Sequence, residues 1–164
     1  MPERILGIDP GFGRVGYGII EQVGGNDWRP VCFGCIETSS KKTFVERLLE
    51  VKNEITKIIE AEKPTRAAVE ELFFFKNLKT AIEVGQARGV ILLTAIENGL
   101  PVDEFTPLQV KQAMTGYGRA EKGQMQRIVA TILNIKGGIK SDDAADALAV
   151  ALTAGQSLWH SRLK

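Results

Sequence analysis

The chain has 164 residues, a length typical of one domain, and 44% of them are apolar and 25% charged. This composition can build a hydrophobic core, and it excludes a disordered, a collagenous or a disulfide-stapled chain. No apolar run reaches the length of a membrane span, and charges at Glu3 and Arg4 interrupt any secretory signal. We therefore expect a cytoplasmic protein with no membrane partner.

The net charge of +1 conceals an uneven distribution. Residues 106–140 carry six basic side chains and one acidic side chain, whereas residues 1–105 have a net charge of −3. A basic segment near acidic clusters suits a polyanion held beside metal-binding carboxylates, although a solvated helix face has the same composition. Charge alone leaves both interpretations open.

The first part of the chain predicts three antiparallel strands. Ile5 to Ile8 is a short apolar run that ends in Asp9-Pro10-Gly11, which is typical of a buried strand and a turn. A second strand is expected over residues 15–20, where glycines on one face allow another backbone or a helix to approach closely. Residues 28–37 predict the third strand.

Beyond this meander the apolar residues follow a helical period. Helices are predicted over residues 43–62 and 77–98, from Pro107, over about 120–133, and from the N-cap Ser141; strands are predicted over residues 66–70 and 101–105. Three strands followed by alternating helices and strands predict an α/β domain with a mixed five-stranded sheet flanked by helices.

The two cysteines, Cys32 and Cys35, have the spacing of half a zinc site. A zinc site needs four ligands, and the only histidine, His160, lies far along the chain. Both cysteines fall within the third predicted strand, where positions three apart point to opposite faces. We therefore expect two buried free thiols, which fit a reducing compartment.

Acidic residues end two apolar strands and begin the last helix. Asp9 and Glu70 follow buried strands, where a charge is unfavourable without a partner or a metal ion. Asp143 and Asp146 share one face of the last helix, but so do Asp142 and Asp146, and spacing alone does not select the pair. Each acid has an ordinary structural explanation, such as a favourable interaction with the helix dipole. Together they favour a site for Mg²⁺ or Mn²⁺, because these ions prefer oxygen ligands and offset the repulsion between clustered carboxylates.

Several motifs, in this order along the chain, resemble the RuvC family of Holliday-junction resolvases. They are Leu6-Gly7-Ile8-Asp9-Pro10-Gly11, Val69-Glu70-Glu71-Leu72-Phe73 with Lys76-Asn77, Gly85-Gln86-Ala87-Arg88-Gly89, Val110-Lys111-Gln112, Gly116 to Lys122, and Asp143-Ala144-Ala145-Asp146-Ala147-Leu148-Ala149. The first motif also opens actin-like ATPases and sugar kinases, so it is the ordered set that carries the resemblance.

The resemblance implies a ribonuclease-H-like fold, a single nuclease domain over residues 1–164 with a short unassigned tail at about 155–164, and a homodimer. The implied activity is metal-dependent nicking of two opposite strands of a four-way DNA junction in recombination and repair, leaving 5′-phosphate and 3′-hydroxyl ends. The implied cofactor is Mg²⁺, with about two ions per subunit and Mn²⁺ as a substitute. The implied partners are four-way junction DNA and a RuvA–RuvB branch-migration complex.

By position in the motifs, the resemblance implies Asp9, Glu70, Asp143 and Asp146 as the catalytic and metal-binding carboxylates. The Asp-Ala-Ala-Asp frame selects Asp143 over Asp142, although family members differ in ligand type at this position. We expect Asp9 to be the ligand shared by both ions, because the end of a central strand can serve both.

Aromatic and basic side chains are the candidate DNA contacts. Phe73 matches the family's aromatic residue and is expected to stack on an unpaired base, whereas core packing is the alternative and is the main expectation for Phe74 and Phe75. Arg88 lies within a helix, and an internal ion pair is expected for it rather than a contact with DNA. The resemblance implies Lys111 and Lys122 as contacts with the DNA backbone, and Lys76 and Arg119 are further candidates for DNA binding.

Other interpretations are weaker at this stage. An actin-like ATPase or kinase needs a second domain to close over the nucleotide, for which 164 residues are too few. YqgF-type nucleases share the fold and the opening motif but match the lysine-bearing and Asp-Ala-Ala-Asp segments less well, and the complete set of acids disfavours a junction-binding protein without catalysis. Small residues at Ala81, Gly85 and Gly89 allow close packing of the 77–98 helix against either a second subunit or the sheet.

Overall fold

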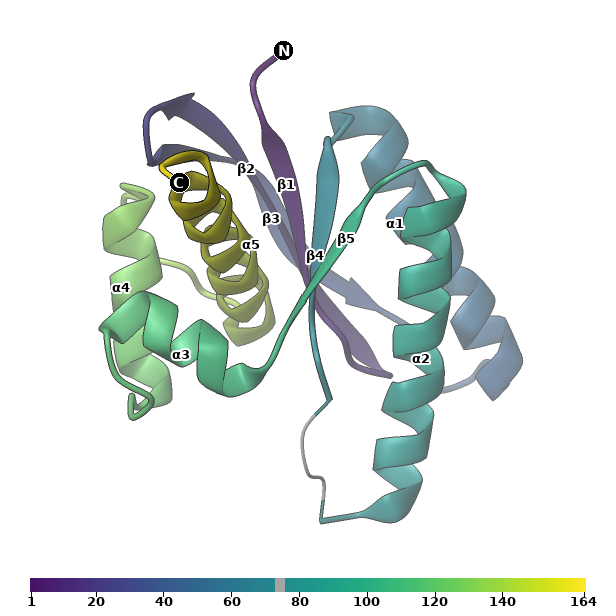
Figure 1. The fold of residues 1–164 in the computed structure, drawn as a ribbon. Helices are drawn as coiled ribbons and strands as arrows, with labels where there is room; N and C mark the ends of the chain where they lie inside the picture. Colours follow the sequence, from purple (N-terminus) through teal and green to yellow (C-terminus); the bar gives the residue numbers. More distant parts are fainter. Residues whose placement is uncertain (73–75) are drawn as a thin grey trace.

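The computed structural model describes residues 1–72 and 76–164. Five strands form one sheet in the order β3-β2-β1-β4-β5 (Figure 1). The neighbours β1, β2 and β3 are antiparallel, whereas β4 and β5 run parallel to β1, so the predicted mixed sheet is confirmed. The strands are β1 (Arg4–Asp9), β2 (Arg14–Gly24), β3 (Asp27–Glu37), β4 (Arg66–Glu70) and β5 (Val102–Phe105).

Helices cover both faces of this sheet (Figure 1). One face carries α1 (Phe44–Glu62) and α2 (Leu78–Glu97), and the other carries α3 (Pro107–Thr115), α4 (Lys122–Ile132) and α5 (Asp142–Arg162). Among the described helices, none combines the length and the apolar character needed to cross a membrane.

Capping side chains explain where these helices begin. Thr43 accepts a hydrogen bond from the backbone N–H of Glu46 before α1, and Ser141 accepts one from that of Ala144 before α5. Pro107 occupies the first turn of α3, where its missing N–H costs nothing. The predicted starts of these three helices are confirmed.

Alternation along the strands divides the core into two clusters. Leu6 and Ile8 of β1 point to one face of the sheet and pack in the cluster that contains Ile55 of α1. Ile5 points to the opposite face and packs in the cluster that contains Leu148 of α5. The central strand is therefore buried on both sides, between two layers of helices.

The helix α5 lies directly on the sheet because the strands present glycines beneath it. A Cβ at Gly7 would lie 2.1 Å from the carbonyl oxygen of Ala147, and one at Gly16 would lie 2.0 Å from that of Asp143. Such distances leave room only for hydrogen. The close approach predicted at the glycines of the second strand is confirmed, and it places the first turn of α5 over β2.

The segment expected as a tail without a motif continues α5 to Arg162. Gly155 packs there against the ring of Trp28, where a Cβ would lie 2.6 Å from the nearest ring atom. Every residue from Ala147 to Gly155 is buried, so this part of the helix has no polar face. A helix that is buried on all sides has no regular alternation of polar and apolar residues, so the sequence did not indicate where this helix ends.

Cys32 and Cys35 are free thiols that point to different faces of β3. Cys32 packs against the cluster under α1, whereas the Sγ atom of Cys35 lies 3.8 Å from Oδ2 of Asp143 on α5. The predicted divergence of the two side chains is confirmed. The expected burial is wrong, since both residues are only partly buried on what is an edge strand of the sheet.

Candidate active site

Asp9 and Glu70 lie side by side where β1 and β4 end. Ile8 pairs with Val69 in the register of these parallel strands, so the residues that follow are neighbours. Side chains alternate between the two faces of a strand, so Asp9 lies on the same face as Gly7, which contacts α5. The same alternation along β4 places Glu70 on this face. Both carboxylates therefore lie on the face of the sheet that α5 covers.

The helix α5 brings two more acids to this end of the sheet. Asp143 and Asp146 lie in its first turns. Asp146 lines a cavity of about 350 Å³ together with Glu70 of β4, Lys111 of α3 and Lys122 of α4. Acidic and basic side chains from four elements thus meet around one cavity, although they are widely separated along the chain.

Burial and mutual repulsion raise the pKa of three of these carboxyl groups. Burial first, and then the charges of neighbouring acids with Glu70 foremost, raise the pKa of Asp9 to about 9. Burial followed by the charge of Asp146 raises the pKa of Glu70 to about 7. Burial also raises the pKa of Asp146 to about 6, against the opposing effect of Lys122. Without a cation, the cluster is therefore partly protonated at neutral pH.

This donor set fits a hard divalent cation. Each of the four side chains offers only carboxylate oxygens, and burial, followed by the charges of neighbouring acids, raises the pKa of three of them. Within residues 1–72 and 76–164, no three acidic, histidine or cysteine side chains are arranged to hold one ion together as they stand. A bound ion would have to draw these carboxylates closer together.

Asp143 has a basic partner that the sequence did not predict. Arg14 of β2 donates from Nε to Oδ2 of Asp143 at 2.8 Å, and its Nη1 atom lies 3.0 Å from Oε1 of Glu37 on β3. Arg14 precedes Gly16 by two residues, so it shares the face of β2 on which α5 lies. This spacing is the sequence signal that could have identified it.

Asp142, the first residue of α5, contacts two side chains of α4. Lys122 Nζ lies 2.9 Å from Oδ2 of Asp142, and Gln126 donates to Oδ1. These partners are one helical turn apart, so Asp142 ties α4 to the start of α5. Lys122, which the sequence implied as a DNA contact, is thus already paired within the chain.

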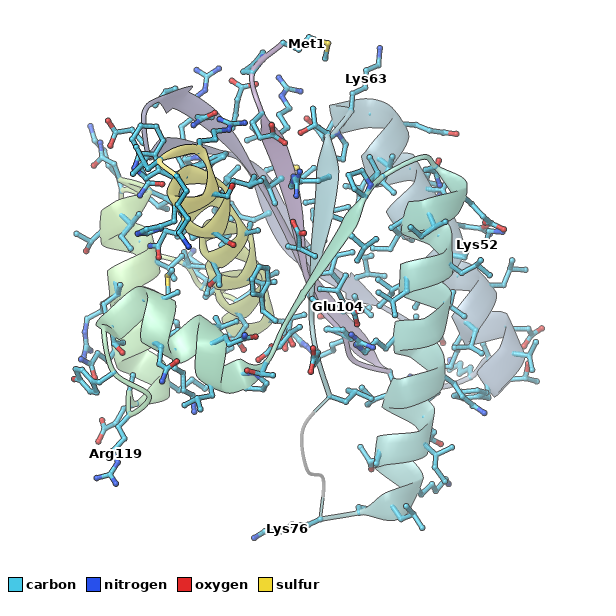
Figure 2. The ribbon with its side chains drawn as sticks, in the orientation of Figure 1. Met1, Lys52, Lys63, Lys76, Glu104 and Arg119 are labelled. Atoms are coloured by element: carbon cyan, nitrogen blue, oxygen red, sulfur yellow. The ribbon has the colours of Figure 1, made fainter. Side chains whose placement is uncertain are left out.

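The other implied DNA contacts lie around the same end of the molecule. Arg119 lines a second cavity, of about 490 Å³, which shares Lys111 with the carboxylate cavity. Figure 2 shows Arg119 and Lys76 extending away from the ribbon at the end where the parallel strands finish. Phe73, the candidate for base stacking, lies outside the described residues, as do the two phenylalanines after it.

Arg88 of α2 forms the internal ion pair that was expected. Its guanidinium pairs with Glu104 of β5, and its Nε donates to the backbone carbonyl of Glu70 at 3.1 Å. The ion-pair interpretation is confirmed. The second bond fixes the end of β4 from the side of α2, which helps to hold the Glu70 carboxylate in place.

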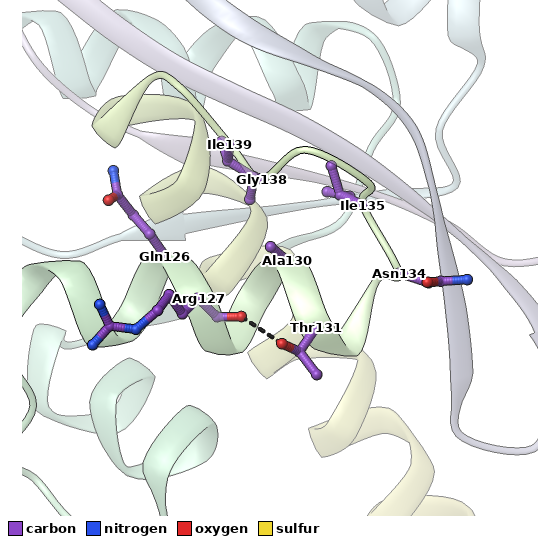
Figure 3. A pocket seen from close by; sticks show the side chains of 8 residues that line it. All are labelled: Gln126, Arg127, Ala130, Thr131, Asn134, Ile135, Gly138 and Ile139. Atoms are coloured by element: carbon purple, nitrogen blue, oxygen red, sulfur yellow. Dashed lines mark hydrogen bonds between the residues drawn. The ribbon is translucent and has the colours of Figure 1, made fainter.

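A larger cavity, of about 560 Å³, lies between α4 and the segment that follows it (Figure 3). Its one internal hydrogen bond in Figure 3 runs from the Thr131 hydroxyl to the carbonyl of Arg127. None of the described residues that line it is acidic, so they offer no carboxylate to a cation. The lining residues are Gln126, Arg127, Ala130, Thr131, Asn134, Ile135, Gly138 and Ile139.

The mixed sheet with this strand order, crossed by a helix and bearing carboxylates at the ends of adjacent parallel strands, defines the class of ribonuclease-H-like nucleases. The sequence model of the family described as "Crossover junction endodeoxyribonuclease RuvC" matches residues 5–154. The chain belongs to this family, and it is an endonuclease that acts on DNA.

Individual relatives agree with this assignment. The crossover junction endodeoxyribonuclease RuvC of Petrotoga mobilis is 51% identical over 151 residues, 92% of each chain. That of Caldicellulosiruptor saccharolyticus is 53% identical over 149 residues, 91% of this chain and 90% of the relative. The solved structure of T. thermophilus RuvC in complex with a Holliday junction substrate has a TM-score of 0.88 at 34% identity and covers 98% of this chain and 96% of that chain. The yeast mitochondrial Holliday junction resolvase Ydc2 has a TM-score of 0.71 at 13% identity, covers 98% of this chain and 80% of its own, and shares the fold.

Proposed function

We propose that this chain resolves Holliday junctions by metal-dependent nicking of two opposite strands, leaving 5′-phosphate and 3′-hydroxyl ends. The observation that carries the proposal is the cavity at which Glu70 and Asp146 meet Lys111 and Lys122, beside Asp9. Acids suited to cations and lysines suited to phosphates share one location, as hydrolysis of a DNA phosphodiester requires. Family membership supplies the junction as the substrate.

The four carboxylates would hold the metal. Asp9, Glu70, Asp143 and Asp146 offer oxygen ligands to Mg²⁺, for which Mn²⁺ substitutes, and we propose two ions per subunit. Asp9 is the proposed shared ligand, because the charges of all three other acids act on its carboxyl group. When bound, the ions supply activation of the attacking water and stabilisation of the leaving 3′ oxygen.

The basic side chains would position the DNA. Lys111 and Lys122 line the carboxylate cavity and would hold the phosphates next to the scissile bond. Arg119 continues this basic surface through the adjoining cavity, and Lys76 lies exposed at the same end of the molecule. Stacking of Phe73 on an unpaired base stays a prediction from the sequence.

We also propose a homodimer with α2 at its interface, because a two-fold enzyme can face both strands of a two-fold junction. One face of α2 exposes four large apolar side chains by 53–74%, and two glycines between them keep the surface low. Sedimentation of the wild type as a dimer and of Ile82→Asp as a monomer would support this interface, and a wild-type monomer on junction DNA would refute it. The residues of this face are Leu78, Ile82, Gly85, Gly89, Leu93 and Ile96.

Family membership further supports three parts of the proposal. They are a single nuclease domain over residues 1–164, a cytoplasmic location that suits the free thiols, and a RuvA–RuvB branch-migration complex as partner. Co-sedimentation with that complex on junction DNA tests the last part.

The main test uses a synthetic four-way junction with a mobile core, incubated with the chain in Mg²⁺, Ca²⁺ or EDTA. A linear duplex and the Asp146→Asn variant are the controls. Paired, symmetric nicks on the junction alone, in Mg²⁺ and with the intact acid, are the expected result. Cleavage by Asp146→Asn at the wild-type rate would contradict the proposed site, and binding without nicks in every metal would leave only a junction-binding protein.

A further inference from the structure

We propose that Arg14 is a positioning residue that orients Asp143 for metal binding, an inference that rests on the proposed metal-dependent function. Arg14 donates from Nε to Oδ2 of Asp143 at 2.8 Å, and the Cys35 thiol lies 3.8 Å from the same oxygen. No hydrogen bond within the described residues reaches Oδ1 of Asp143. The carboxylate is therefore held through one oxygen, while the other stays available to a cation.

The position of Arg14 is itself well defined. Arg14 and Glu37 are directly opposite each other in the register of β2 and β3, and their side chains pair at 3.0 Å. Two residues further along β2, Gly16 lets the backbone of Asp143 lie against the strand. Strand and helix thus fix both ends of the contact between Arg14 and Asp143, and Glu37 holds the guanidinium from the other side.

A partner of this kind changes how well a carboxylate binds metal. Hydrogen bonds from outside the coordination sphere orient the ligating oxygen, and their loss typically costs about 10–100-fold in metal affinity or activity. A guanidinium could instead compete with the cation for Asp143, and its loss would then tighten metal binding. Both donors contact Oδ2 and leave Oδ1 without a hydrogen bond from the described residues. This arrangement favours a guanidinium that orients the Asp143 carboxylate over one that competes with the cation.

Titration of the DNA-free chain with Mn²⁺, followed by calorimetry or electron paramagnetic resonance, tests the inference. We expect Arg14→Gln to raise the apparent Kd for Mn²⁺ by about 10–100-fold and Arg14→Lys to recover part of the loss. Glu37→Gln removes the anchor but keeps the donor, so its effect should have the same direction and be smaller. In an Asp143→Ala background, Arg14→Gln should have no further effect.

Arg29→Gln is the matched control. Arg29 is also an ion-paired arginine of the β2–β3 hairpin, but it pairs with Glu21 at the opposite end of the sheet. Its replacement should leave the Kd for Mn²⁺ unchanged. A change in Kd as large as that of Arg14→Gln would mean that any loss of charge on the hairpin weakens metal binding, and the inference would fail.

Junction cleavage by the same variants separates this inference from the proposed function. Arg14→Gln should raise the Mg²⁺ concentration for half-maximal cleavage and leave junction affinity in Ca²⁺ unchanged. An unchanged or tighter Kd for Mn²⁺ overturns the inference, and so does a loss of junction affinity with unchanged Kd, which would make Arg14 a DNA contact. If the wild type cleaves no junction in any metal, the proposed function fails, while the Mn²⁺ titration still reports on Arg14.

Discussion

The two ends of the sheet surround their acidic side chains in opposite ways. At the amino end of β1, Glu21 is only 4% exposed, and hydrogen bonds from Arg29 and Arg4 lower its pKa. At the carboxyl end, Asp9 and Glu70 form no ion pair with any basic side chain that the structure describes, and their pKa values are raised. The amino end compensates the charge of its buried acid with two arginines, whereas the carboxyl end leaves Asp9 and Glu70 for a ligand.

Ion pairs at the amino end of β1 also involve three more elements, β4, β5 and α5. Arg66 of β4 lies between Glu3 and Asp103, with an Nε–Oε1 distance of 3.3 Å and an Nη1–Oδ2 distance of 2.6 Å. Arg162, in the last turn of α5, also reaches Glu3, at 3.4 Å. Stabilising and reactive charges can thus occupy the same short strands when they lie at opposite ends.

Replacing one acid at each end by its amide should give the largest difference. Glu70→Gln should slow junction cleavage in saturating Mg²⁺ by about 10³-fold or more, because a cation supplies several kcal/mol of charge stabilisation to the transition state. Its metal-free Tm should rise, since a repelled carboxylate is removed. Glu21→Gln should lower Tm, because Arg4 and Arg29 lose a buried partner, and leave cleavage per folded molecule unchanged.

Cleavage time courses and thermal melts of both variants measure these effects. The Tm of each variant identifies any loss of cleavage that comes from unfolding alone. Equal losses of cleavage in Glu70→Gln and Glu21→Gln would show that the two ends of the sheet do not differ in function.

The next largest effect concerns the contact between Gly16 of β2 and the start of α5, which positions the acids of α5. Gly16→Ala should destabilise the chain by about 1–3 kcal/mol, because the added Cβ would lie 2.0 Å from the carbonyl oxygen of Asp143 and push α5 off β2. Gly24→Ala is the control near the other end of β2, where no atom of the described residues lies within 4 Å of the added Cβ. Urea denaturation measures both, and equal stabilities would show that α5 is not fixed by this contact.

The pH dependence of stability should also distinguish the two ends. The pKa of Asp9 rises from 3.8 to about 9 on folding, so between these values the folded chain binds more protons than the unfolded chain. Stability therefore falls as pH rises through this window, the opposite of the contribution from Glu21, whose pKa is lowered. Metal-free Tm should fall between about pH 5 and 9, by about 2–4 °C for each kcal/mol lost.

Melts at several pH values check this trend. Asp9→Asn should flatten the dependence, and saturating Mg²⁺ should flatten it in the wild type. A metal-free Tm that rises steadily over the same range would contradict the raised pKa of Asp9.

The smallest effect concerns the lysines beside the acids. Lys111→Gln should weaken junction binding in Ca²⁺ and make the slope of log K against log salt less steep by about 0.9, the value for one lost phosphate contact. Lys52→Gln is the control, because Lys52 pairs with Glu97 on the α1 and α2 side of the molecule (Figure 2). Binding curves at several salt concentrations measure both, and equal slopes for Lys111→Gln and the wild type would exclude the contact.

Most of the fold could be predicted because each element has a local signal. Apolar runs bounded by turn residues marked the strands, and the N-cap Ser141 and Pro107 marked helix starts. Asp9 and Glu70 stood out for the opposite reason, since an acid at the end of an apolar strand is locally unfavourable. These anomalies indicated the site before any contact was known.

The remaining features depend on contacts between distant segments. Arg14 looks like an ordinary basic residue at the start of a strand, and its partner Asp143 lies 129 positions away. The last turns of α5 carried no signal because the residues before them are buried on all sides. Edge placement of β3 left Cys32 and Cys35 partly exposed, which the apolar sequence around them did not indicate.

The helix α5 also couples the two ends of the sheet, because its rotation about its own axis is the same at both ends. Its 21 residues rise about 30 Å, from the acids of the first turn to Arg162 in the last. Glycine contacts at Gly7, Gly16 and Gly155 hold the helix against neighbouring elements at three heights, so it cannot turn freely about its axis. One residue inserted between Asp146 and Gly155 would rotate one end against the other by about 100°. The direction in which the acids point is thus set along the whole length of the helix.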